Sequence, residues 1–266
     1  MIVGSGLIAR AFAQGGANDI GDTCFYAAGV SNSGCKDERE YLRERMRLDA
    51  AIAECSPHDQ IVYFSTCSIE DPATRDSEYV KHKILIENRV RDCARHLILR
   101  LPQVAGRTPN PHTLLNYLHA RIARSERFHI WGGAIRNIID VDDVVKIAMD
   151  LIKTEGANAE TITIANPCST MMLDIVRAME RVLGDRAVFD ILDIGSGSSI
   201  DIGRISASIK RCAITFGDAY LGDIIEKYYG VYSIEKCYGV HSHGMDTVPV
   251  YRPNPLSVFH QPGWQI

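Results

Sequence analysis

Three polar side chains in the first third of the chain have the types and the spacing needed for proton transfer. Tyr79 and Lys83 stand four residues apart in a segment of helical periodicity, so their phenol and ammonium share one helical face. The cation can lower the phenol pKa from about 10 towards working pH. Thr66 ends an apolar strand, where its hydroxyl can orient a substrate oxygen while Tyr79 exchanges the proton. The alternative interpretation is a packed Tyr79 beside a solvated Lys83.

A glycine turn near the N-terminus indicates a second candidate site, one for an anionic cofactor. Gly4, Gly6 and Ala9 form G-x-G-x-x-A between a short strand and a helix. Such a turn lets the backbone approach a pyrophosphate at a helix N-terminus. The expected contacts extend over the start of the helix and are made by Gly4, Gly6, Leu7, Ile8, Ala9 and Arg10, although Arg10 is equally interpretable as a surface charge.

The elements that must position these residues alternate between short apolar strands and amphipathic helices. This order predicts an α/β fold with a Rossmann-like, doubly wound parallel sheet. The expected strands are 1–3, 23–28, 60–65 and 96–101, and the expected helices are 7–14, 37–54 and 78–94. After residue 106 the expected elements are helices near 112–124, 141–153, 170–183 and 214–229, with strands at 128–131, 161–164 and 188–193.

This change in regularity predicts three parts of the chain. Residues 1–106 form the dinucleotide-binding core, and 107–230 form a smaller α/β substrate lid that can return a strand or helix to the core. Residues 231–266 form a C-terminal tail without a sustained period.

Helical periodicity also predicts which faces of the two long helices are apolar. In 37–54 the predicted apolar face carries Leu42, Met46, Ala50 and Ala53. In 78–94 the corresponding face carries Tyr79, Lys83, Ile86 and Val90.

Composition excludes several classes of protein. The 266 residues are 46% apolar and carry a net charge of −4, which argues against disorder, nucleic acid binding and attraction to anionic membranes. No apolar run reaches the roughly 20 residues of a membrane span, and no signal pattern opens the chain, so we expect a cytoplasmic protein. The eight cysteines are scattered, which predicts reduced thiols, mostly small core residues.

Several motifs in order resemble the extended short-chain dehydrogenase/reductase family, the NAD-dependent epimerases and dehydratases that modify nucleotide sugars. The resemblance covers roughly residues 1–230. The motifs are VGSGLIA at 3–9, FYAAGVSNS at 25–33, YFSTCS at 63–68, YVKHK at 79–83, LRLPQVAG at 99–106 and RNIIDVDDV at 136–144.

The resemblance implies a role for each matching residue. Thr66 takes the Ser/Thr position, Tyr79 is the acid and base, and Lys83 holds the nicotinamide ribose and tunes Tyr79. Further implied cofactor contacts are Ala27, Ala28 and Gly29, and implied substrate contacts are Cys67, Ser68, Gln103 and Arg136, with Arg136 reaching a diphosphate. The implied cofactor is NAD or NADP, and the implied substrate is a nucleotide-diphosphate sugar. The apolar faces of the helices at 37–54 and 78–94 suggest a homodimer through a four-helix contact, as is common in relatives.

Two departures from the family pattern refine the expected reaction. Only the short segment 10–26 separates the glycine turn from the double alanine, so the usual second strand, helix and third strand are missing. The acid that normally binds the adenosine ribose is lost with them, and Asp19 and Asp22 are poor substitutes. Cys67 and Ser68 stand where sugar dehydratases carry an Asp and a Glu, which disfavours dehydration.

Reduction and epimerisation therefore remain as the expected reactions. Either would serve the synthesis of polysaccharide or glycoconjugate precursors. The alternative from another class is a non-catalytic protein that binds a sugar nucleotide or dinucleotide through a degenerate Rossmann fold.

Three other motifs are weighed against structural interpretations. ILDIGSGSS at 191–199 looks like an S-adenosylmethionine loop, but too few residues follow it, so we interpret it as part of the lid. Cys237, His241 and His243 lack further anchored ligands for zinc, so no metal site is expected. Asp142 and Asp143 are expected to begin a helix, where their charge meets its positive end.

Overall fold

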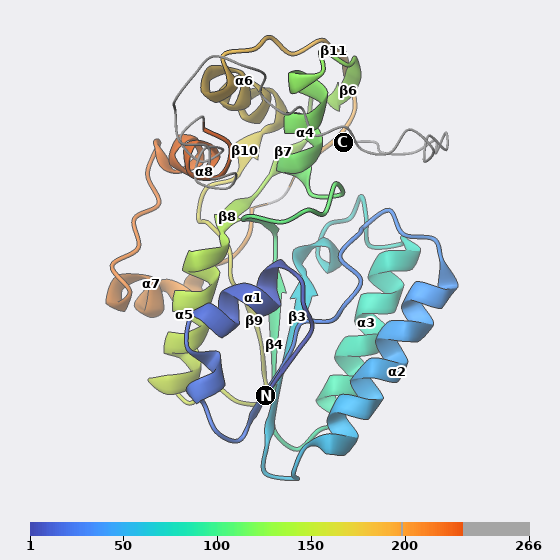
Figure 1. Ribbon diagram of the computed structural model, residues 1–266, viewed down its shortest axis with the longest axis vertical. Helices are drawn as coiled ribbons and strands as arrows, with labels where there is room; N and C mark the ends of the chain where they lie inside the picture. The colour runs from blue at the N-terminus through green and yellow to red at the C-terminus, as the bar shows by residue number, and fades with distance from the viewer. Residues whose placement is uncertain (198, 231–266) are drawn as a thin grey trace, which may run out of the picture.

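A five-stranded parallel sheet forms the centre of the lower half of the molecule (Figure 1). The computed structural model describes residues 1–197 and 199–230. The strands are β1 (Ile2–Val3), β2 (Thr23–Tyr26), β3 (Gln60–Thr66), β4 (His96–Leu101) and β9 (Glu160–Thr163), in the order β1-β2-β3-β4-β9. All neighbouring pairs are parallel. The predicted α/β class with a parallel central sheet is confirmed.

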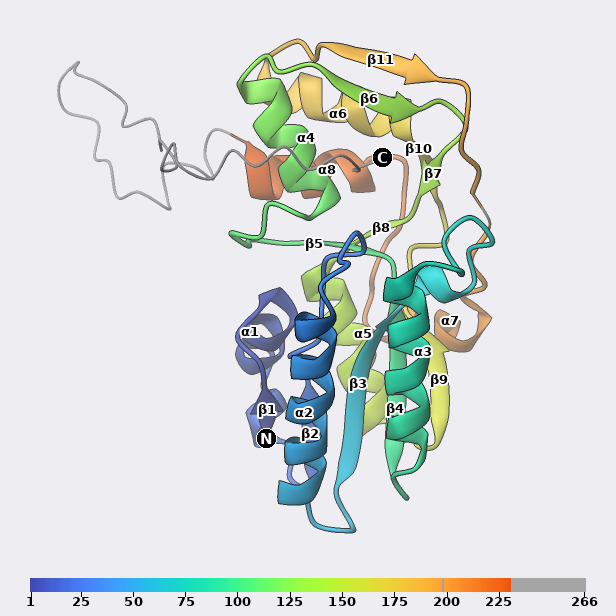
Figure 2. The ribbon, with the colours of Figure 1, turned by 90° about the vertical axis from the view of Figure 1, so that its right-hand side faces the viewer.

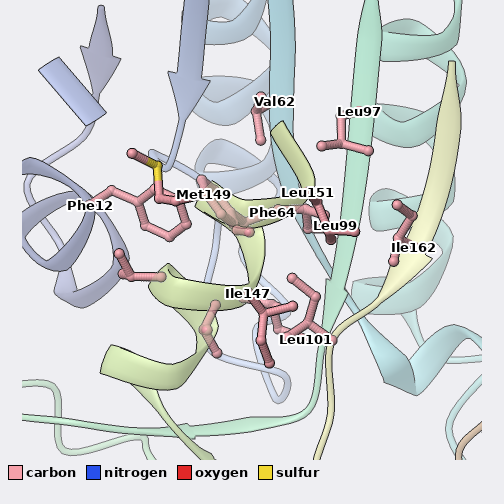
Figure 3. Packing of buried hydrophobic residues seen from close by; sticks show 14 of the residues in the cluster. Phe12, Val62, Phe64, Leu97, Leu99, Leu101, Ile147, Met149, Leu151 and Ile162 are labelled. Atoms are coloured by element: carbon pink, nitrogen blue, oxygen red, sulfur yellow. The ribbon is translucent and has the colours of Figure 1, made fainter. Parts of the chain in front are cut away.

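Helices cover both faces of this sheet (Figures 1 and 2). One face packs on α1 (Leu7–Gln14) and α5 (Val141–Lys153), and the other on α2 (Glu38–Glu54) and α3 (Glu78–Arg91). Strand β3 alternates between the two faces. Its Val62 and Phe64 belong to the core beneath α1 and α5, shown in Figure 3, whereas Tyr63 belongs to the core beneath α2 and α3.

Strand β1 lies at one edge of the sheet (Figure 2). Between α1 and β2 the chain forms only the short helix η1 (Ala17–Asp19). Ile2 is in register with Phe25, and no strand within the described ranges pairs with the outer side of β1. The order of the strands therefore agrees with a sheet from which the usual second strand, helix and third strand are missing.

The upper half has its own hydrophobic core, built from three small sheets and three helices. The strand pairs are β5 (Gln103–Ala105) with β8 (Ile138–Asp140), β6 (Phe128–Trp131) with β11 (Phe189–Leu192), and β7 (Ile135–Arg136) with β10 (Thr170–Met171). The helices are α4 (Leu114–Ala123), α6 (Met172–Leu183) and α8 (Tyr220–Tyr229). Helix α7 (Ser206–Arg211), preceded by η3 (Gly203–Ile205), lies against the lower half beside α5.

The apolar face predicted for α2 points to solvent in the single chain and does not pack on the sheet. Leu42 is 48% exposed and Met46 is 64% exposed, and the alanines at 50 and 53 also face solvent. The residues that face the sheet are Tyr41, Glu44, Leu48 and Ala51. The buried face contains a carboxylate that is satisfied by hydrogen bonds, so hydrophobicity alone does not identify the side of the helix that is buried. In α3 the predicted residues Tyr79, Lys83, Ile86 and Val90 are all buried.

The predicted helix at 214–229 is also wrong in its first half. Ala213 has a φ of 52° and ends α7, and α8 begins only at Tyr220. Ile214 and Phe216, which suggested a helical face, instead pack against the hydrophobic core of the lower half. Among the seven described cysteines, all of them free thiols, only Cys24 is buried, so the expectation of mostly core cysteines is wrong as well.

The remaining sequence expectations concern other binding classes. The glycine loop after β11 belongs to the upper half, where β11 pairs with β6 and not with the five-stranded sheet. Cys237, His241 and His243 lie outside the described residues. Asp140 caps α5 and accepts a hydrogen bond from the Asp142 backbone, with Asp142 and Asp143 in the first turn. Within the described ranges, no helix has the length and hydropathy of a membrane span, and no group of three metal-ligating residues occurs.

Candidate active site

Helix α3 places Tyr79 and Lys83 beside the carboxyl end of β3. The helix begins after Ser77, whose hydroxyl accepts a hydrogen bond from the Val80 backbone N–H at 3.3 Å. Tyr79 is 8% exposed and Lys83 is 3% exposed. The spacing of four residues therefore puts both polar groups on the buried face of the helix, and the interpretation of Lys83 as a solvated surface charge is wrong.

Thr66 ends β3 and begins η2 (Cys67–Ile69). Its hydroxyl accepts a hydrogen bond from the Ser68 backbone N–H at 3.1 Å and donates to the Ser68 hydroxyl at the same distance. The Thr66 side chain also lies near the Tyr79 phenol and acts to lower its pKa. The structure thus brings together the three residues to which the sequence assigned proton transfer.

The electrostatics of Tyr79 differ from the sequence expectation. Burial raises the pKa of this phenol, and the charge of Lys83 and the side chain of Thr66 oppose that rise without cancelling it. The charge of Glu44 adds to the rise. Tyr79 is therefore a protonated phenol near neutral pH, and the expected net lowering of its pKa is not found.

Lys83 is held by two buried acceptors. Its Nζ donates to Glu44 Oε1 at 3.2 Å and to the Tyr63 hydroxyl at 3.0 Å. The Tyr63 hydroxyl in turn donates to Glu44 Oε1 at 3.0 Å. The same Nζ lies 5.7 Å from the centroid of the Tyr79 ring. Within the described residues, these bonds use two of the three donors of the ammonium group.

Glu44 is the residue of this site that sequence reasoning missed. Its side chain is fully buried, and its second oxygen, Oε2, accepts from the Val30 backbone N–H at 2.7 Å and lies 2.9 Å from His82 Nε2. Burial alone would raise the pKa of this carboxyl, but Lys83, His82 and Val30 outweigh it and lower the pKa to about 2. The available signal was its helical phase with Tyr41 and Leu48, which places Glu44 on the buried face.

The glycine turn packs on the segment that follows β2. Gly4 has a φ of 129°, and a Cβ there would come 2.5 Å from the Ala27 carbonyl oxygen, so the turn requires glycine. Gly6 precedes α1, and the space beside it is open. Leu7, Ile8 and Ala9 form the first turn of α1, and Ala9 is buried. The backbone N–H groups of this first turn have no acceptor within the helix.

Arg10 is exposed and folds back along the turn. Its guanidinium donates to the Ser5 carbonyl oxygen at 2.6 Å and to the Arg107 carbonyl oxygen at 3.2 Å. It therefore connects the glycine turn to the segment after β5.

The segment Ala27, Ala28 and Gly29 connects the two candidate sites. Ala27 contacts the glycine turn, and Gly29 lies against the buried ion pair. A Cβ on Gly29 would come 2.7 Å from Lys83 Nζ and 2.8 Å from Glu44 Oε1. The missing side chain of Gly29 therefore leaves the room that the ion pair occupies.

The predicted substrate contacts lie directly after β3, on β5 and on β7. Cys67 and Ser68 directly follow Thr66 and are half-buried, and burial raises the pKa of the Cys67 thiol to about 12. Arg136 is half-buried on β7; burial lowers the pKa of its guanidinium, and the charge of Asp71 opposes this. Gln103 is exposed on β5, and no bond of its own among the described residues reaches Thr66, Tyr79 or Lys83.

A family model matches the sequence at this centre. The NAD dependent epimerase/dehydratase family matches residues 21–165, which include β2, β3, α3 and the residues Thr66, Tyr79 and Lys83. The chain belongs to this family. A search of curated proteins finds no match to the sequence.

Solved structures show the same fold. MoeE5 in complex with UDP-glucuronic acid and NAD has 16% sequence identity and a TM-score of 0.67, covering 89% of this chain and 98% of its own. UDP-glucuronic acid 4-epimerase from Bacillus cereus, in complex with UDP-glucuronic acid and NAD, has 19% identity and a TM-score of 0.62, covering 86% of this chain and 79% of its own. A UDP-galactose 4-epimerase has 16% identity and a TM-score of 0.63, covering 84% of this chain and 80% of its own.

Proposed function

We propose that the protein is a reductase or epimerase of nucleotide sugars that uses NAD or NADP and supplies precursors of polysaccharides or glycoconjugates. The observation that carries this proposal is the meeting of Thr66, Tyr79 and Lys83 at the carboxyl end of β3, in a member of the NAD dependent epimerase/dehydratase family. In open parallel sheets, ligands bind at the carboxyl ends of the strands.

The residues present fit the nicotinamide and pyrophosphate parts of such a cofactor. The space beside Gly6, at the N-terminus of α1, is open and suits a pyrophosphate. The donor of Lys83 that is not used by Glu44 or Tyr63 suits a ribose hydroxyl. When bound, the cofactor would accept or supply the hydride at the sugar carbon. The backbone of Ala28 and Gly29, between these two places, would line its path.

Proton transfer falls to Tyr79. Because its pKa is raised, the phenol holds its proton near neutral pH and can donate it to a carbonyl oxygen as that oxygen gains charge. Thr66 would orient the same oxygen through its hydroxyl. The ammonium of Lys83 would then stabilise the phenolate. A protonated Tyr79 is the form that reduction of a keto group requires.

The residues around the centre suit a diphosphate-linked sugar that is not dehydrated. Arg136 has no ion pair among the described residues, and its half-buried guanidinium suits the diphosphate. Elimination of water would require an acid and a base at positions 67 and 68. The Cys67 thiol stays protonated, with a pKa of about 12, and Ser68 does not ionise, so these two cannot act as that pair.

The exposed apolar residues of α2 and α3 support a homodimer through these two helices. Leu42 and Met46 on α2, and Ile84 and Leu85 on α3, are large apolar side chains that face solvent in the single chain. Two copies could cover them in a four-helix contact. Sedimentation of the protein and of Leu42→Glu tests this contact, because a buried charge there should leave the variant monomeric.

Replacement of Tyr79 by Phe tests the enzyme proposal. The variant lacks only the proton donor, so turnover of a keto-sugar or sugar nucleotide with NADH or NADPH should fall by several powers of ten. Cofactor affinity, measured by fluorescence titration, should change little. Unchanged turnover would remove Tyr79 from the mechanism. Binding of a sugar nucleotide or dinucleotide without turnover in the parent protein would instead favour the non-catalytic alternative.

A further inference from the structure

We propose that Glu44 is a positioning residue of this site, whose buried carboxylate fixes Lys83 and supplies the negative charge against which Tyr79 must ionise. The catalytic consequence rests on the proposed function. The electrostatic consequence does not, because it concerns only groups of the folded chain.

The Glu44 carboxylate joins four parts of the chain. Glu44 itself comes from α2, Lys83 and His82 come from α3, and Tyr63 comes from β3. The fourth partner is the Val30 backbone, directly after the Ala28 and Gly29 segment. One carboxylate thus fixes both the helix that carries Tyr79 and the backbone expected to line the cofactor.

The Glu44 carboxylate and its partners also fix the orientation of Lys83 and the register of α2 and α3. An unpaired ammonium as buried as that of Lys83 would carry a large desolvation cost, which the Glu44 carboxylate offsets. The Tyr63 hydroxyl donates to Glu44 and accepts from Lys83, so it fixes the direction in which Nζ points. His82 stacks on Tyr41 of α2, with ring centroids 4.5 Å apart, which holds the two helices in register.

The ionisation of Tyr79 depends on the charged and titratable groups around it. Titratable groups face Tyr79 from four elements: Lys83 from α3, Glu44 and Tyr41 from α2, Tyr63 from β3 and Cys67 from η2. Glu44 in turn faces His82 and Lys83 from α3, Tyr63 from β3 and Tyr26 from β2.

With Glu44 ionised, Lys83 protonated and Tyr79 neutral, the buried centre carries no net charge. Ionisation of Tyr79 then leaves a net charge of −1, which burial disfavours. In Glu44→Gln the centre starts at +1, and loss of a proton makes it neutral. Ionisation of Tyr79 is therefore less disfavoured in this variant, and its phenol should lose the proton at a lower pH.

The experiment compares Glu44→Gln with Glu87→Gln, a second buried glutamate of the same layer that has no contact with Lys83 or Tyr79. Glu87 is 1% exposed and bonds to Ser65, Arg91 and Arg100 instead. Tyrosinate absorbance is followed against pH in the parent and in both variants. Each is compared with its own Tyr79→Phe partner, so that the difference isolates residue 79 among the 11 tyrosines.

We expect the residue 79 signal of Glu44→Gln to appear at least one pH unit lower than in the parent, and that of Glu87→Gln to stay within a few tenths of a unit. The pH profile of turnover in the oxidative direction should move the same way. An unmoved signal in Glu44→Gln, or an equal movement in both variants, would overturn the inference. The absorbance titration needs neither cofactor nor substrate, so absence of turnover with a normal titration overturns only the proposed enzyme function.

Folding of the variants supplies a second readout. Removal of Glu44 leaves the Lys83 ammonium buried without its counter-ion, so Glu44→Gln should lose stability that the additional change Lys83→Met restores. Should Glu44→Gln fail to fold, the double variant is expected to fold. Failure of both, with Lys83→Met alone folding, would mean that Glu44 does not act through Lys83.

Discussion

Two buried glutamates, Glu44 and Glu87, lie on the same face of the sheet but pair with cations that differ in solvent exposure. Strand β3 contributes one hydroxyl to each, because Tyr63 and Ser65 are two residues apart and point to the same face. Glu87 pairs with Arg91 and Arg100, which are 38% and 16% exposed. Glu44 pairs with Lys83, whose side chain is 3% exposed.

The two clusters differ in whether their cations can reach water or another acid. Arg100 also pairs with the exposed Glu70 at 2.7 Å, so the cations around Glu87 keep a route to water and to another acid. That cluster ties α3 to β4 and works as structure. The Lys83 ammonium has no such route, and it lies 5.7 Å from the ring centroid of Tyr79, the residue to which we assign proton exchange. We therefore expect Glu44, whose partner Lys83 is buried, to constrain the candidate site. Glu87, whose arginine partners reach solvent, mainly holds α3 against β4.

The largest expected effect separates the two clusters by stability. Glu44→Ala leaves the buried Lys83 unpaired, so its free energy of unfolding should fall by about 4 kcal/mol. Glu87→Ala should cost about 2 kcal/mol, since Arg91 and Arg100 can turn to solvent or to Glu70. Urea denaturation at neutral pH measures both values. Equal losses would show that burial of the cation does not distinguish the clusters.

Acid stability should also differ between the parent and a Glu44 variant. The pKa of Glu44 is lowered from an ordinary 4.5 to about 2 in the folded protein. A lowered pKa contributes stability that is present above about 4.5 and is lost as the pH falls towards about 2, on the order of 3 kcal/mol. Glu44→Gln should therefore lose less stability than the parent over this interval. Denaturation series at several acidic pH values test this, and parallel curves would contradict it.

The smallest expected effect comes from the two hydroxyls of β3. Tyr63→Phe leaves Glu44 and Lys83 each short of one buried partner and should cost about 2 kcal/mol. Ser65→Ala removes one of several donors to Glu87 and should cost about 1 kcal/mol. Thermal denaturation ranks the two variants, and the tyrosinate titration of residue 79 should respond only to Tyr63→Phe. The reverse order of stability would weaken the contrast between the clusters.

The placement of Thr66, Tyr79 and Lys83 could be predicted from the sequence. Tyr79 and Lys83 share a helix, and Thr66 ends a strongly apolar strand, so local periodicity and strand order sufficed to place them together. The short segment between α1 and β2 likewise indicated a reduced sheet, which the strand order matches.

What could not be predicted depends on contacts between distant segments. The helical phase of Glu44 with Tyr41 and Leu48 indicates a buried position. Its partners Val30, Tyr63, His82 and Lys83 converge on it from three other segments, and no local pattern records that convergence. For the same reason, periodicity groups Leu42 and Met46 on one apolar face of α2 without showing that this face points outward in the single chain. Ile214 and Phe216 suggested a helix because their packing against the lower core is not visible in a local period.

The close approach of Gly29 to the ion pair limits how this site can vary among related chains. A methyl group at position 29 would meet both the ammonium of Lys83 and the carboxylate of Glu44. A relative with a larger residue at that position must therefore carry a shorter acid at position 44, a different cation at position 83, or a displaced loop. We expect these three positions to change together in an alignment, as a linked set whose members are distant in sequence.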